Sequence, residues 1–556
     1  IGGAFLIKHF SFSLTEWDDI EVAQTPSERP NILLLVAEDL SARVHAFGDS
    51  LATTPNIDAL AKIGVRYPNT FTTAGVCSPS RAALMMGVHQ ISFGGQHMRT
   101  ATRPEGAYLS VPPQEMKAFP ELLRRAGYFT FNTAKQDYQF SGAMPGSGPF
   151  TIWDEENDPD LWRNRREGQP FFGMLNFLET HETGLFPPLG HRPKNMQQLL
   201  IQLFRTGLES SDIEVPLEEI KIPPYFADTK TVRQDMARHY QNIHAMDGIV
   251  GNLMDKLKRD GLLESTIVIW TTDHGDCLPR GKRELYDSGI KVPMIIYWPE
   301  KFRPVDVQPG TIDERMISFV DFAPTFLSLA AAPIPDYLHG SDLANDSLAR
   351  SFIYASRDRI DEVRDRQRAI RDQRFKYIRS WYPQQEGGHR LAFRDNLPMM
   401  EEFWKLKVEN KLDKEQLIWF EDPGEERLFD LKNDPFELND ISKDSAYTED
   451  LLRMRNALDD WLISVEDWSE ESENEMVLRF QPQGITEQTP TPEMKMIGDM
   501  LEISAKDGAS IGYQIEGGKW ELYTEPISLE EGQSLKAKAI RYGWEESEVQ
   551  EYVAND

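Results

Sequence analysis

The chain has 556 residues, which exceeds one ordinary domain and predicts two to four. Apolar residues make up 40% and aromatic residues 10%, which is enough for a sizeable buried core and unlike a disordered chain. The formal net charge of −30 disfavours nucleic acid or an anionic membrane as a partner, because both need a basic face.

Residues 1–28 are predicted to be an N-terminal extension, and residues 29–350 to form the largest domain. Four short apolar runs in this domain are typical of strands buried on both faces, and helical patterns lie between them. This alternation predicts an α/β fold, a mostly parallel sheet sandwiched by helices, with its site at the carboxyl ends of the strands. The runs are Asn31–Val36, Phe171–Phe177, Thr266–Thr272 and Pro293–Trp298, and the helical patterns are Ile57–Ile63, Glu121–Ala126 and Val232–Lys258.

Residues 351–480 are predicted to form a smaller antiparallel subdomain. Polar and apolar residues alternate there, at Arg368–Arg371 and Phe375–Arg379, as in half-exposed strands, and Asp450–Ser464 has a helical pattern. The Pro-, Thr- and Gly-rich stretch 481–499 indicates a linker. Short alternating runs over residues 500–556 then predict a small appended β-sandwich. No run of about 18 apolar residues is present, so no membrane span is predicted.

Two acidic pairs follow predicted strands, Glu38-Asp39 after the first and Asp273-His274 after the third. The carboxyl ends of parallel strands meet at one crevice, so we expect these side chains to converge. Three carboxylates repel one another unless a cation neutralises them, and an oxygen-rich set suits Ca²⁺ or Mg²⁺. Taken singly, each pair is explained as well by a helix cap at Asp39 and a loop residue at His274.

The chain contains two cysteines, Cys77 and Cys277, which are too few for a disulfide framework, although a bridge between them stays open. The sequence Cys-Ser-Pro-Ser-Arg at residues 77–81 is predicted to open a helix, with Ser78 as its N-cap and Pro79 in its first position. Cys77 would then lie just ahead of a helix N-terminus, where the partial positive charge favours anions. A lone cysteine there is usually a small apolar residue, but the whole pentapeptide is much rarer.

The Cys-x-Pro-x-Arg pattern followed by a helix resembles the signature of type I sulfatases, within the alkaline phosphatase superfamily, in which the Cys is oxidised to formylglycine. The resemblance covers about residues 31–476, and it is stronger to bacterial polysaccharide sulfatases than to heparan N-sulfohydrolases. Further segments match in the family's order, and they are Asn31–Leu40, Thr271–Gly275, Arg280–Pro293 and Leu428–Leu438.

This resemblance implies a sulfuric ester hydrolase that uses formylglycine made from Cys77 and a bound Ca²⁺, with Mg²⁺ as the alternative. One hydroxyl of the hydrated formylglycine attacks sulfur with the help of the metal, and the second then expels sulfate. The resemblance also assigns roles. Arg81 holds the formylglycine and the metal carboxylates, Lys135 and Lys282 bind sulfate oxygens, and His181 protonates the leaving oxygen. The implied metal ligands are Glu38, Asp39, Asp273 and His274.

One position departs from the family pattern. The usual Lys-x-His is Lys135-Gln136-Asp137 here, so Asp137 replaces the His that contacts the formylglycine. Either Asp137 assists the elimination, or a nearby His such as His97 supplies the base. A similar variant in a branch that includes bacterial polysaccharide sulfatases indicates that the change is not an inactivation.

The expected substrate is a sulfated polysaccharide or oligosaccharide. Glu179, Arg357 and Arg359, with His97 and Asp137, are candidates for a sugar subsite, although a salt-bridge network explains each about as well. The C-terminal segment resembles the small sandwich of chitobiase-type hexosaminidases, which fits carbohydrate work outside the cytoplasm. The chain does not begin with Met, as expected for a fragment or a trimmed export precursor. We therefore predict a periplasmic or secreted bacterial protein, matured by a formylglycine-generating enzyme or an anaerobic maturase.

Two other functions stay open. A phosphonate or phosphate monoester hydrolase of the same superfamily shares the metal crevice and can share formylglycine. Such sites tend to use manganese or zinc and to lack the lysine pair, so Lys135 and Lys282 favour the sulfatase. A non-catalytic binder of sulfated glycans would have lost the nucleophile or the metal acids, and the sequence retains both.

Overall fold

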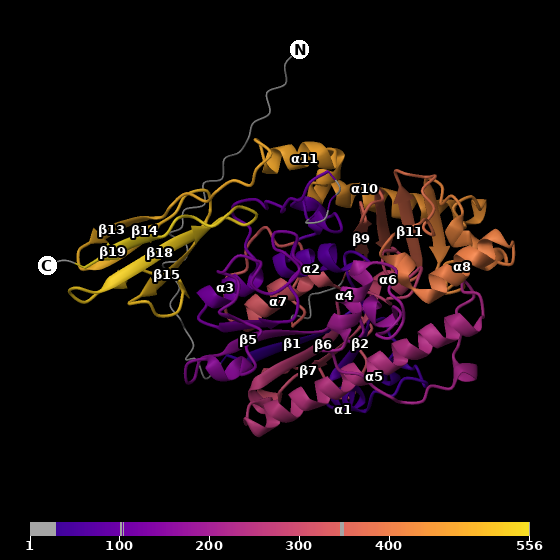
Figure 1. Ribbon diagram of the computed structural model, residues 1–556, viewed down its shortest axis with the longest axis horizontal. Helices are drawn as coiled ribbons and strands as arrows, with labels where there is room; N and C mark the ends of the chain where they lie inside the picture. The colour runs from indigo at the N-terminus through magenta and orange to yellow at the C-terminus, as the bar shows by residue number, and fades with distance from the viewer. Residues whose placement is uncertain (1–28, 101–102, 104, 345–349, 555–556) are drawn as a thin grey trace, which may run out of the picture.

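The structure is a computed structural model that describes residues 29–100, 103, 105–344 and 350–554, so the predicted extension 1–28 lies outside the described residues. An eight-stranded sheet forms its centre, in the order β4-β3-β5-β1-β6-β7-β2-β8 (Figure 1). All its strands run in one direction except β7, which is antiparallel to both neighbours. The strands are β1 (Asn31–Ala37), β2 (Val65–Phe71), β3 (Phe129–Thr133), β4 (Glu155–Glu156), β5 (Phe171–Phe177), β6 (Thr266–Thr272), β7 (Lys291–Tyr297) and β8 (Ile317–Ser318). The predicted mostly parallel sheet is confirmed.

Alternate residues of β1 pack into two different hydrophobic cores. Ile32, Leu34 and Val36 face one core, whereas Leu33 and Leu35 face the other. All seven residues of β1 are buried, which explains the apolar run from Ile32 to Ala37, and burial of each Ile, Leu or Val side chain stabilises the fold by about 1.5–3 kcal/mol. Helices α1 (Pro55–Ile63) and α5 (Lys230–Arg259) cover one face, and α2 (Cys77–Met86), α3 (Phe119–Arg125) and α7 (Phe322–Leu329) cover the other (Figure 1).

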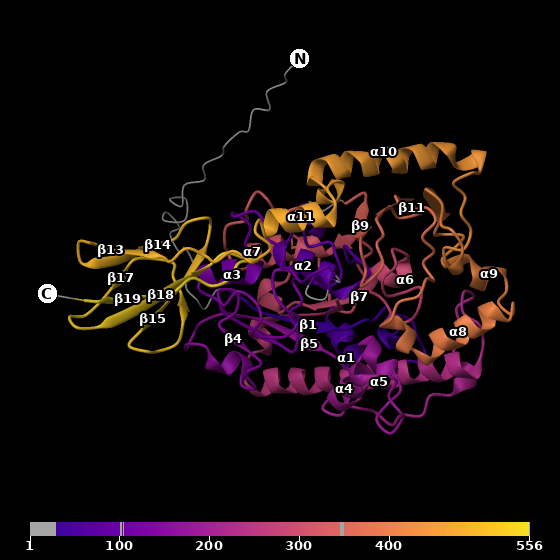
Figure 2. The same ribbon diagram turned by 45° about the horizontal axis from the view of Figure 1, so that its top comes forward.

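A second, antiparallel sheet has the order β12-β11-β10-β9. Helix α10 lies across one face (Figure 2), and the other face packs against the core that contains α5. The prediction of half-exposed strands is therefore wrong. The polar positions are buried in ion pairs, such as Arg368 with Asp358 at 3.0 Å and Lys376 with Glu437 at 2.8 Å. The elements are β9 (Ile353–Arg357), β10 (Gln367–Arg371), β11 (Phe375–Ser380), β12 (Glu426–Asp430) and α10 (Thr448–Val465).

The remaining helices are mostly short and lie around these two sheets (Figures 1 and 2). They are α4 (Met196–Arg205), α6 (Asp287–Ile290), α8 (Pro398–Val408), α9 (Lys414–Leu417) and α11 (Glu473–Phe480). In the described part of the chain, no helix has both the length and the apolar character that a membrane crossing requires.

The C-terminal segment forms two small antiparallel sheets at one end of the molecule (Figure 1). Strand β13 lies inside the range 481–499 that was predicted to be a linker, and its pairing with β14 means that the sandwich begins before residue 500. Most of β13 is exposed, so it lacks the apolar signal that marked the other strands. The strands are β13 (Glu493–Ile497), β14 (Met500–Ser504), β15 (Ser510–Ile515), β16 (Glu521–Leu522), β17 (Ile527–Ser528), β18 (Ser534–Ile540) and β19 (Gln550–Val553).

Glu121 on α3 joins this sandwich to the central sheet domain. Its side chain is fully buried and accepts hydrogen bonds from the hydroxyls of Ser510 at 2.5 Å, Tyr542 at 2.7 Å and Thr151 at 2.7 Å. Arg125 adds an ion pair at 3.0 Å. Burial alone would raise the pKa of Glu121, but Arg125, Lys117 and these hydroxyls lower it to about 2. The carboxylate is therefore ionised and fully hydrogen-bonded.

Candidate active site

The site lies where β1 and β6 end. These strands are paired, with Ala37 opposite Thr272, so the residues that follow them come together at one edge of the sheet. The backbone N–H of Asp39 donates to Oδ1 of Asp273 at 3.0 Å. Asp39 has a φ of 50°, a left-handed conformation that Asp tolerates better than most residues. The expected convergence of the two acidic pairs is present in the structure.

A buried imidazole lies between these carboxylates. Nε2 of His274 is 2.9 Å from Oδ1 of Asp39 and 3.8 Å from Oδ1 of Asp273. Burial favours the neutral ring, but Asp273 and Asp39 raise the pKa of His274 to about 10. The two aspartates therefore make this point favourable for positive charge. Ligand atoms of Asp39, Asp273, His274 and Cys77 all lie within 4.8 Å of one another, and this donor set fits a divalent metal ion.

Glu38, the fourth predicted metal ligand, lies beside this group. Its Oε1 accepts from Nη2 of Arg81 and its Oε2 accepts from Nζ of Lys135 at 2.6 Å. Glu38 also belongs to a second cluster of donor atoms with Asp39, Cys77 and His181. Both of its oxygens are thus held by cations, so its role as a metal ligand stays a prediction.

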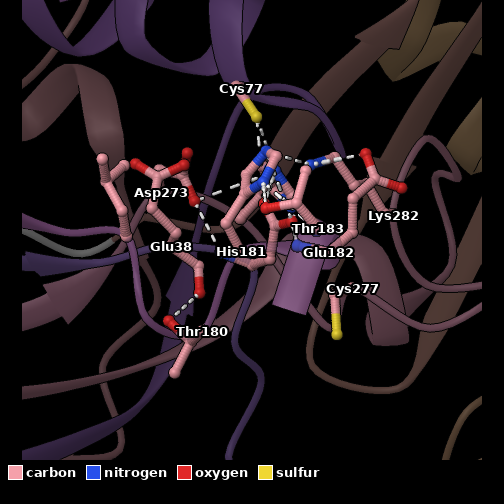
Figure 3. A network of polar contacts seen from close by, with 12 residues as sticks. Glu38, Cys77, Thr180, His181, Glu182, Thr183, Asp273, Cys277 and Lys282 are labelled. Atoms are coloured by element: carbon pink, nitrogen blue, oxygen red, sulfur yellow. Dashed lines mark hydrogen bonds and ion pairs between the residues drawn. The ribbon is translucent and has the colours of Figure 1, made fainter. Parts of the chain in front are cut away.

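Cys77 is the first residue of α2, and its side chain is fully buried. Its Sγ lies 3.3 Å from Nε2 of His274 and 3.8 Å from Oδ1 of Asp39. Figure 3 shows the sulfur pointing toward the charged cluster, with Glu38 and Asp273 on one side and Lys282 on the other. A group attached at position 77 would therefore meet the acids, the imidazole and a lysine together.

The predicted capping of this helix is wrong, because its N-cap is Val76 and Ser78 lies within the first turn. The Ser78 hydroxyl instead donates to Oδ1 of Asp137 at 2.5 Å. Pro79 is still in the first turn, where backbone N–H groups have no partner within the helix. Cys77 consequently lies at the positive end of the helix rather than ahead of it.

Arg81, one turn into α2, joins the strand ends. Its Nε donates to Oδ2 of Asp273 at 3.1 Å, and its Nη1 donates to Oδ1 of Asn176 on β5 at 2.7 Å. With the contact to Glu38, the guanidinium holds two acids and one amide in fixed positions. Arg81 is fully buried, and this network explains how a full charge is accommodated there.

Two lysines carry positive charge to the cluster from different loops. Lys135 follows β3 and pairs with Glu38. Nζ of Lys282 contacts Oδ2 of Asp39 at 2.6 Å and Oε1 of Glu182 at 3.0 Å. Burial disfavours the charged form of both lysines, but Glu38 raises the pKa of Lys135 and Asp39 raises that of Lys282, so both ammonium groups stay charged at the cluster. Such a pair can hold an anion beside position 77.

His181 presents one ring nitrogen to this space. Its Nδ1 lies 3.0 Å from the Thr183 hydroxyl and 3.4 Å from the Thr183 backbone nitrogen. Nε2 lies 3.3 Å from Nζ of Lys282 and 3.9 Å from Oδ2 of Asp39. Burial, with Lys282 next, holds the pKa of His181 well below its usual range, so the ring is neutral, and its Nε2 can accept from the Lys282 ammonium.

The structure distinguishes Asp137 from His97 as candidates for the group that replaces the family's usual histidine. Asp137 contacts the first turn of the Cys77 helix through Ser78, and its Oδ2 lies 3.9 Å from Nζ of Lys135. His97 is buried, and Glu473 and Arg359 are among its nearest charges. Burial lowers the pKa of His97 to about 4, and within the described residues its ring has no hydrogen bond to the cluster. The geometry favours Asp137 over His97.

The other three candidates for a sugar subsite are engaged elsewhere. Arg357 pairs with Glu284 at 2.5 Å, and Arg359 pairs with Glu473 at 2.7 Å. Glu179 accepts a long hydrogen bond of 3.4 Å from the backbone of a neighbouring loop. Across the described ranges, none of the three forms a hydrogen bond or ion pair with the cluster. Each is part of a separate network.

Several contributors were not assigned from the sequence. The backbone N–H of Glu182 donates to Asp39 at 2.7 Å, and its carboxylate binds Arg283 at 2.8 and 2.9 Å. The signal for Asn176 was a polar residue inside an apolar, fully buried strand. The open possibility of a bridge from Cys77 to Cys277 is resolved, because both are free thiols. Cys277 lies apart from the cluster (Figure 3), with its sulfur 3.5 Å from Nδ1 of His239.

Comparisons with known proteins agree on one family. The family model "Sulfatase" matches residues 30–332, and the model "N-sulphoglucosamine sulphohydrolase, C-terminal" matches residues 279–391. An ulvan-active sulfatase of Formosa agariphila is 40% identical over 95% of this chain and 92% of its own.

A solved 2-O GAG sulfatase has a TM-score of 0.55 at 18% identity, covering 81% of this chain and 96% of its own. The phosphonate monoester hydrolase of Agrobacterium radiobacter has a TM-score of 0.52 at 19% identity, covering 79% and 95%. The GAG sulfatase and the phosphonate monoester hydrolase share the fold of this chain.

Proposed function

The chain belongs to the sulfatase family, and from this premise we propose that it removes sulfate from sulfated polysaccharide or oligosaccharide, with Cys77 as the precursor of its nucleophile. One observation carries this proposal. Cys77 lies at the positive end of a helix and beside three buried acids, and Lys135 and Lys282 pair with two of these acids. A sulfate ester carries one negative charge spread over three oxygens, and positive groups around it stabilise that charge.

Asp39, Asp273 and His274 would hold the metal, with Glu38 as the proposed fourth ligand. We propose Ca²⁺, with Mg²⁺ as the alternative, because carboxylate oxygens dominate the set. When bound, the ion supplies the positive charge that favours an ionised oxygen nucleophile over a neutral one. Formylglycine at position 77, made from the thiol by a formylglycine-generating enzyme or an anaerobic maturase, supplies in its hydrated form two hydroxyls on one carbon.

The residues of the chain itself would bind and orient the ester. Lys135 and Lys282 would hold two sulfate oxygens, while Arg81 fixes the acids against the first turn of α2. Nε2 of His181 faces the same space, and in its protonated form His181 would give a proton to the departing sugar oxygen. Asp137 would act beside the first turn of the helix in place of the usual histidine.

The substrate class and the compartment form the finer part of the proposal. The 40% identical relative is named for activity on ulvan, so sulfated algal oligosaccharides are the first substrates to test. Glycosaminoglycan fragments come second, because a family model named for N-sulphoglucosamine sulphohydrolase matches part of the chain. We further propose that the protein is bacterial and is periplasmic or secreted, where such polymers occur.

The test is a comparison of initial rates on aryl sulfate, aryl phosphate and a panel of defined sulfated oligosaccharides, with protein carrying formylglycine at position 77. We expect sulfate release from oligosaccharides and slower hydrolysis of aryl phosphate. Lys282→Ala should lower sulfate hydrolysis, whereas Lys301→Ala, on a distant short helix, serves as the control. Faster phosphate than sulfate hydrolysis would overturn the proposal in favour of a phosphate or phosphonate esterase. Binding without turnover would support a glycan-binding protein.

A further inference from the structure

Arg99 is a positive group near Cys77 that the proposed chemistry does not use. The preceding residue, Met98, packs against Cys77 in a small apolar cluster and forms a β-bridge with Ile360. Within the described residues, the side chain of Arg99 has no hydrogen bond and no ion pair within 4.0 Å, and its Nε is buried without a partner. A guanidinium in such a position usually has an anionic partner.

The neighbouring acids already have other cations. Asp137, Asp361 and Glu182, together with Cys77, are the groups whose charge acts on Arg99. Asp137 lies 3.9 Å from Nζ of Lys135, while Arg283 lies 3.8 Å from Asp361 and 2.8 Å from Glu182. Each acid is therefore closer to another cation than to Arg99. The charges of these acids thus act on the guanidinium, but none of them forms an ion pair with it.

A cation–π contact places this side chain beside an aromatic pair. The guanidinium carbon of Arg99 lies 5.7 Å from the centre of the Phe393 ring, and Phe393 meets Phe186 edge to face at 5.3 Å. Phe186 directly follows the short 3₁₀ helix η7 (Glu182–Leu185), which begins after His181. A cation–π contact leaves the N–H groups of a guanidinium free to donate to an anion. The aromatic pair thus lies between Arg99 and the segment that begins after His181.

We propose that Arg99 binds a second acidic group of the substrate, a carboxylate or another sulfate on the sugar that carries the reacting ester or on the adjoining sugar. This inference rests on the proposed function, and it makes Arg99 a specificity-determining residue for acidic oligosaccharides. The reacting sulfate itself has Lys135 and Lys282 as its candidate partners. Arg99, by contrast, forms no ion pair with the metal acids in the described part of the chain.

The experiment compares kcat/KM for the wild type, Arg99→Ala and Arg99→Lys, all with formylglycine at position 77. The substrates are 4-nitrophenyl sulfate, a sulfated uronate oligosaccharide with its carboxyl-reduced counterpart, and a disulfated oligosaccharide with its monosulfated counterpart. We expect Arg99→Ala to lose about 10- to 100-fold on a substrate with the second acidic group, as for a charge-assisted hydrogen bond. Turnover of 4-nitrophenyl sulfate should stay unchanged, and Arg99→Lys should recover part of the loss.

Arg390→Ala is the matched control. The guanidinium carbon of Arg390 also contacts an aromatic ring, 4.0 Å from the centre of Trp404, but Arg390 pairs with Asp395 at 3.2 Å. Removal of the Arg390 side chain should leave the ratio of kcat/KM between the two members of each substrate pair unchanged. A loss confined to the carboxylate pair of substrates assigns a carboxylate as the partner, and a loss confined to the disulfated pair assigns a sulfate.

An equal loss on all substrates, or no loss on any, would overturn the assignment of Arg99. A wild type that releases sulfate from none of the substrates would instead overturn the proposed function. Thermal unfolding of each variant checks the fold. If Arg99→Ala does not fold, Arg99→Gln carries the same comparison, because it removes the charge but keeps part of the aliphatic stem of the side chain.

Discussion

Buried carboxylates occur at two places in this molecule, and their surroundings differ. Glu121, between α3 and the sandwich, is a single acid whose oxygens accept from three hydroxyls and Arg125, and its pKa falls to about 2. At the ends of β1 and β6, Glu38, Asp39 and Asp273 are crowded together. Burial and the two aspartates raise the pKa of Glu38, although Arg81 and Lys135 oppose the shift. A buried acid alone therefore does not indicate a catalytic site.

The difference lies in how the negative charge is neutralised. Hydroxyl donors and Arg125 satisfy the Glu121 carboxylate completely, so nothing further is needed there. At the ends of β1 and β6, the three acids are instead paired with Arg81, Lys135 and Lys282. Burial favours a neutral His274, but the two aspartates raise its pKa to about 10. Crowding of charged groups beside Cys77, rather than burial, distinguishes the site.

The largest effect is expected when one of the crowded acids is neutralised. Asp273→Asn should abolish metal binding and sulfate release, with a larger loss than the roughly 10- to 100-fold that follows removal of an outer partner of a metal ligand. Metal content by elemental analysis and initial rates on aryl sulfate measure both effects. Glu121→Gln is the matched control, because it removes the same charge elsewhere. An Asp273→Asn variant that binds metal and releases sulfate would contradict the difference drawn between the crowded acids and Glu121.

An intermediate effect is expected at the sandwich junction. Glu121→Ala leaves the hydroxyls of Ser510, Tyr542 and Thr151 without their acceptor and should lower the free energy of unfolding by about 1–3 kcal/mol. Urea unfolding measures the change, and limited proteolysis reports release of the sandwich. Glu115→Ala, at an exposed position nearby, should have little effect. If Glu121→Ala instead abolished aryl sulfate turnover in folded protein, the junction would not be purely structural.

The smallest effect concerns pH. The pKa of Glu121 is about 2 in the folded protein against an ordinary value of 4.5, so its contribution to stability is complete above about pH 4.5. That contribution is lost as the pH falls from 4.5 toward 2, because protonation then favours the unfolded chain. The difference in unfolding free energy between wild type and Glu121→Gln should therefore shrink over this interval. A difference that stays constant down to pH 3 would contradict the structural role of the ionised carboxylate.

The sequence was most informative where signals were local. Apolar runs identified β5 and β6, and the acids that follow strands identified the crevice. Ser78 illustrates what local patterns miss, because its partner Asp137 comes from a loop 59 residues away and draws the hydroxyl from its capping role. Arg359 was also ambiguous until its pairing with the distant Glu473 was known. Long-range ion pairs of this kind leave no periodic pattern in the sequence.

The central claim is that the nucleophile of this sulfatase is made from Cys77. The direct measurement quantifies formylglycine at position 77 by peptide mass spectrometry and sulfate release from the same preparations, made with and without a maturation enzyme. Sulfate release should rise in proportion to the converted fraction, and Cys77→Ser should bind substrate without sustained turnover. Repeated turnover by Cys77→Ser, or by fully unconverted protein, would contradict the account.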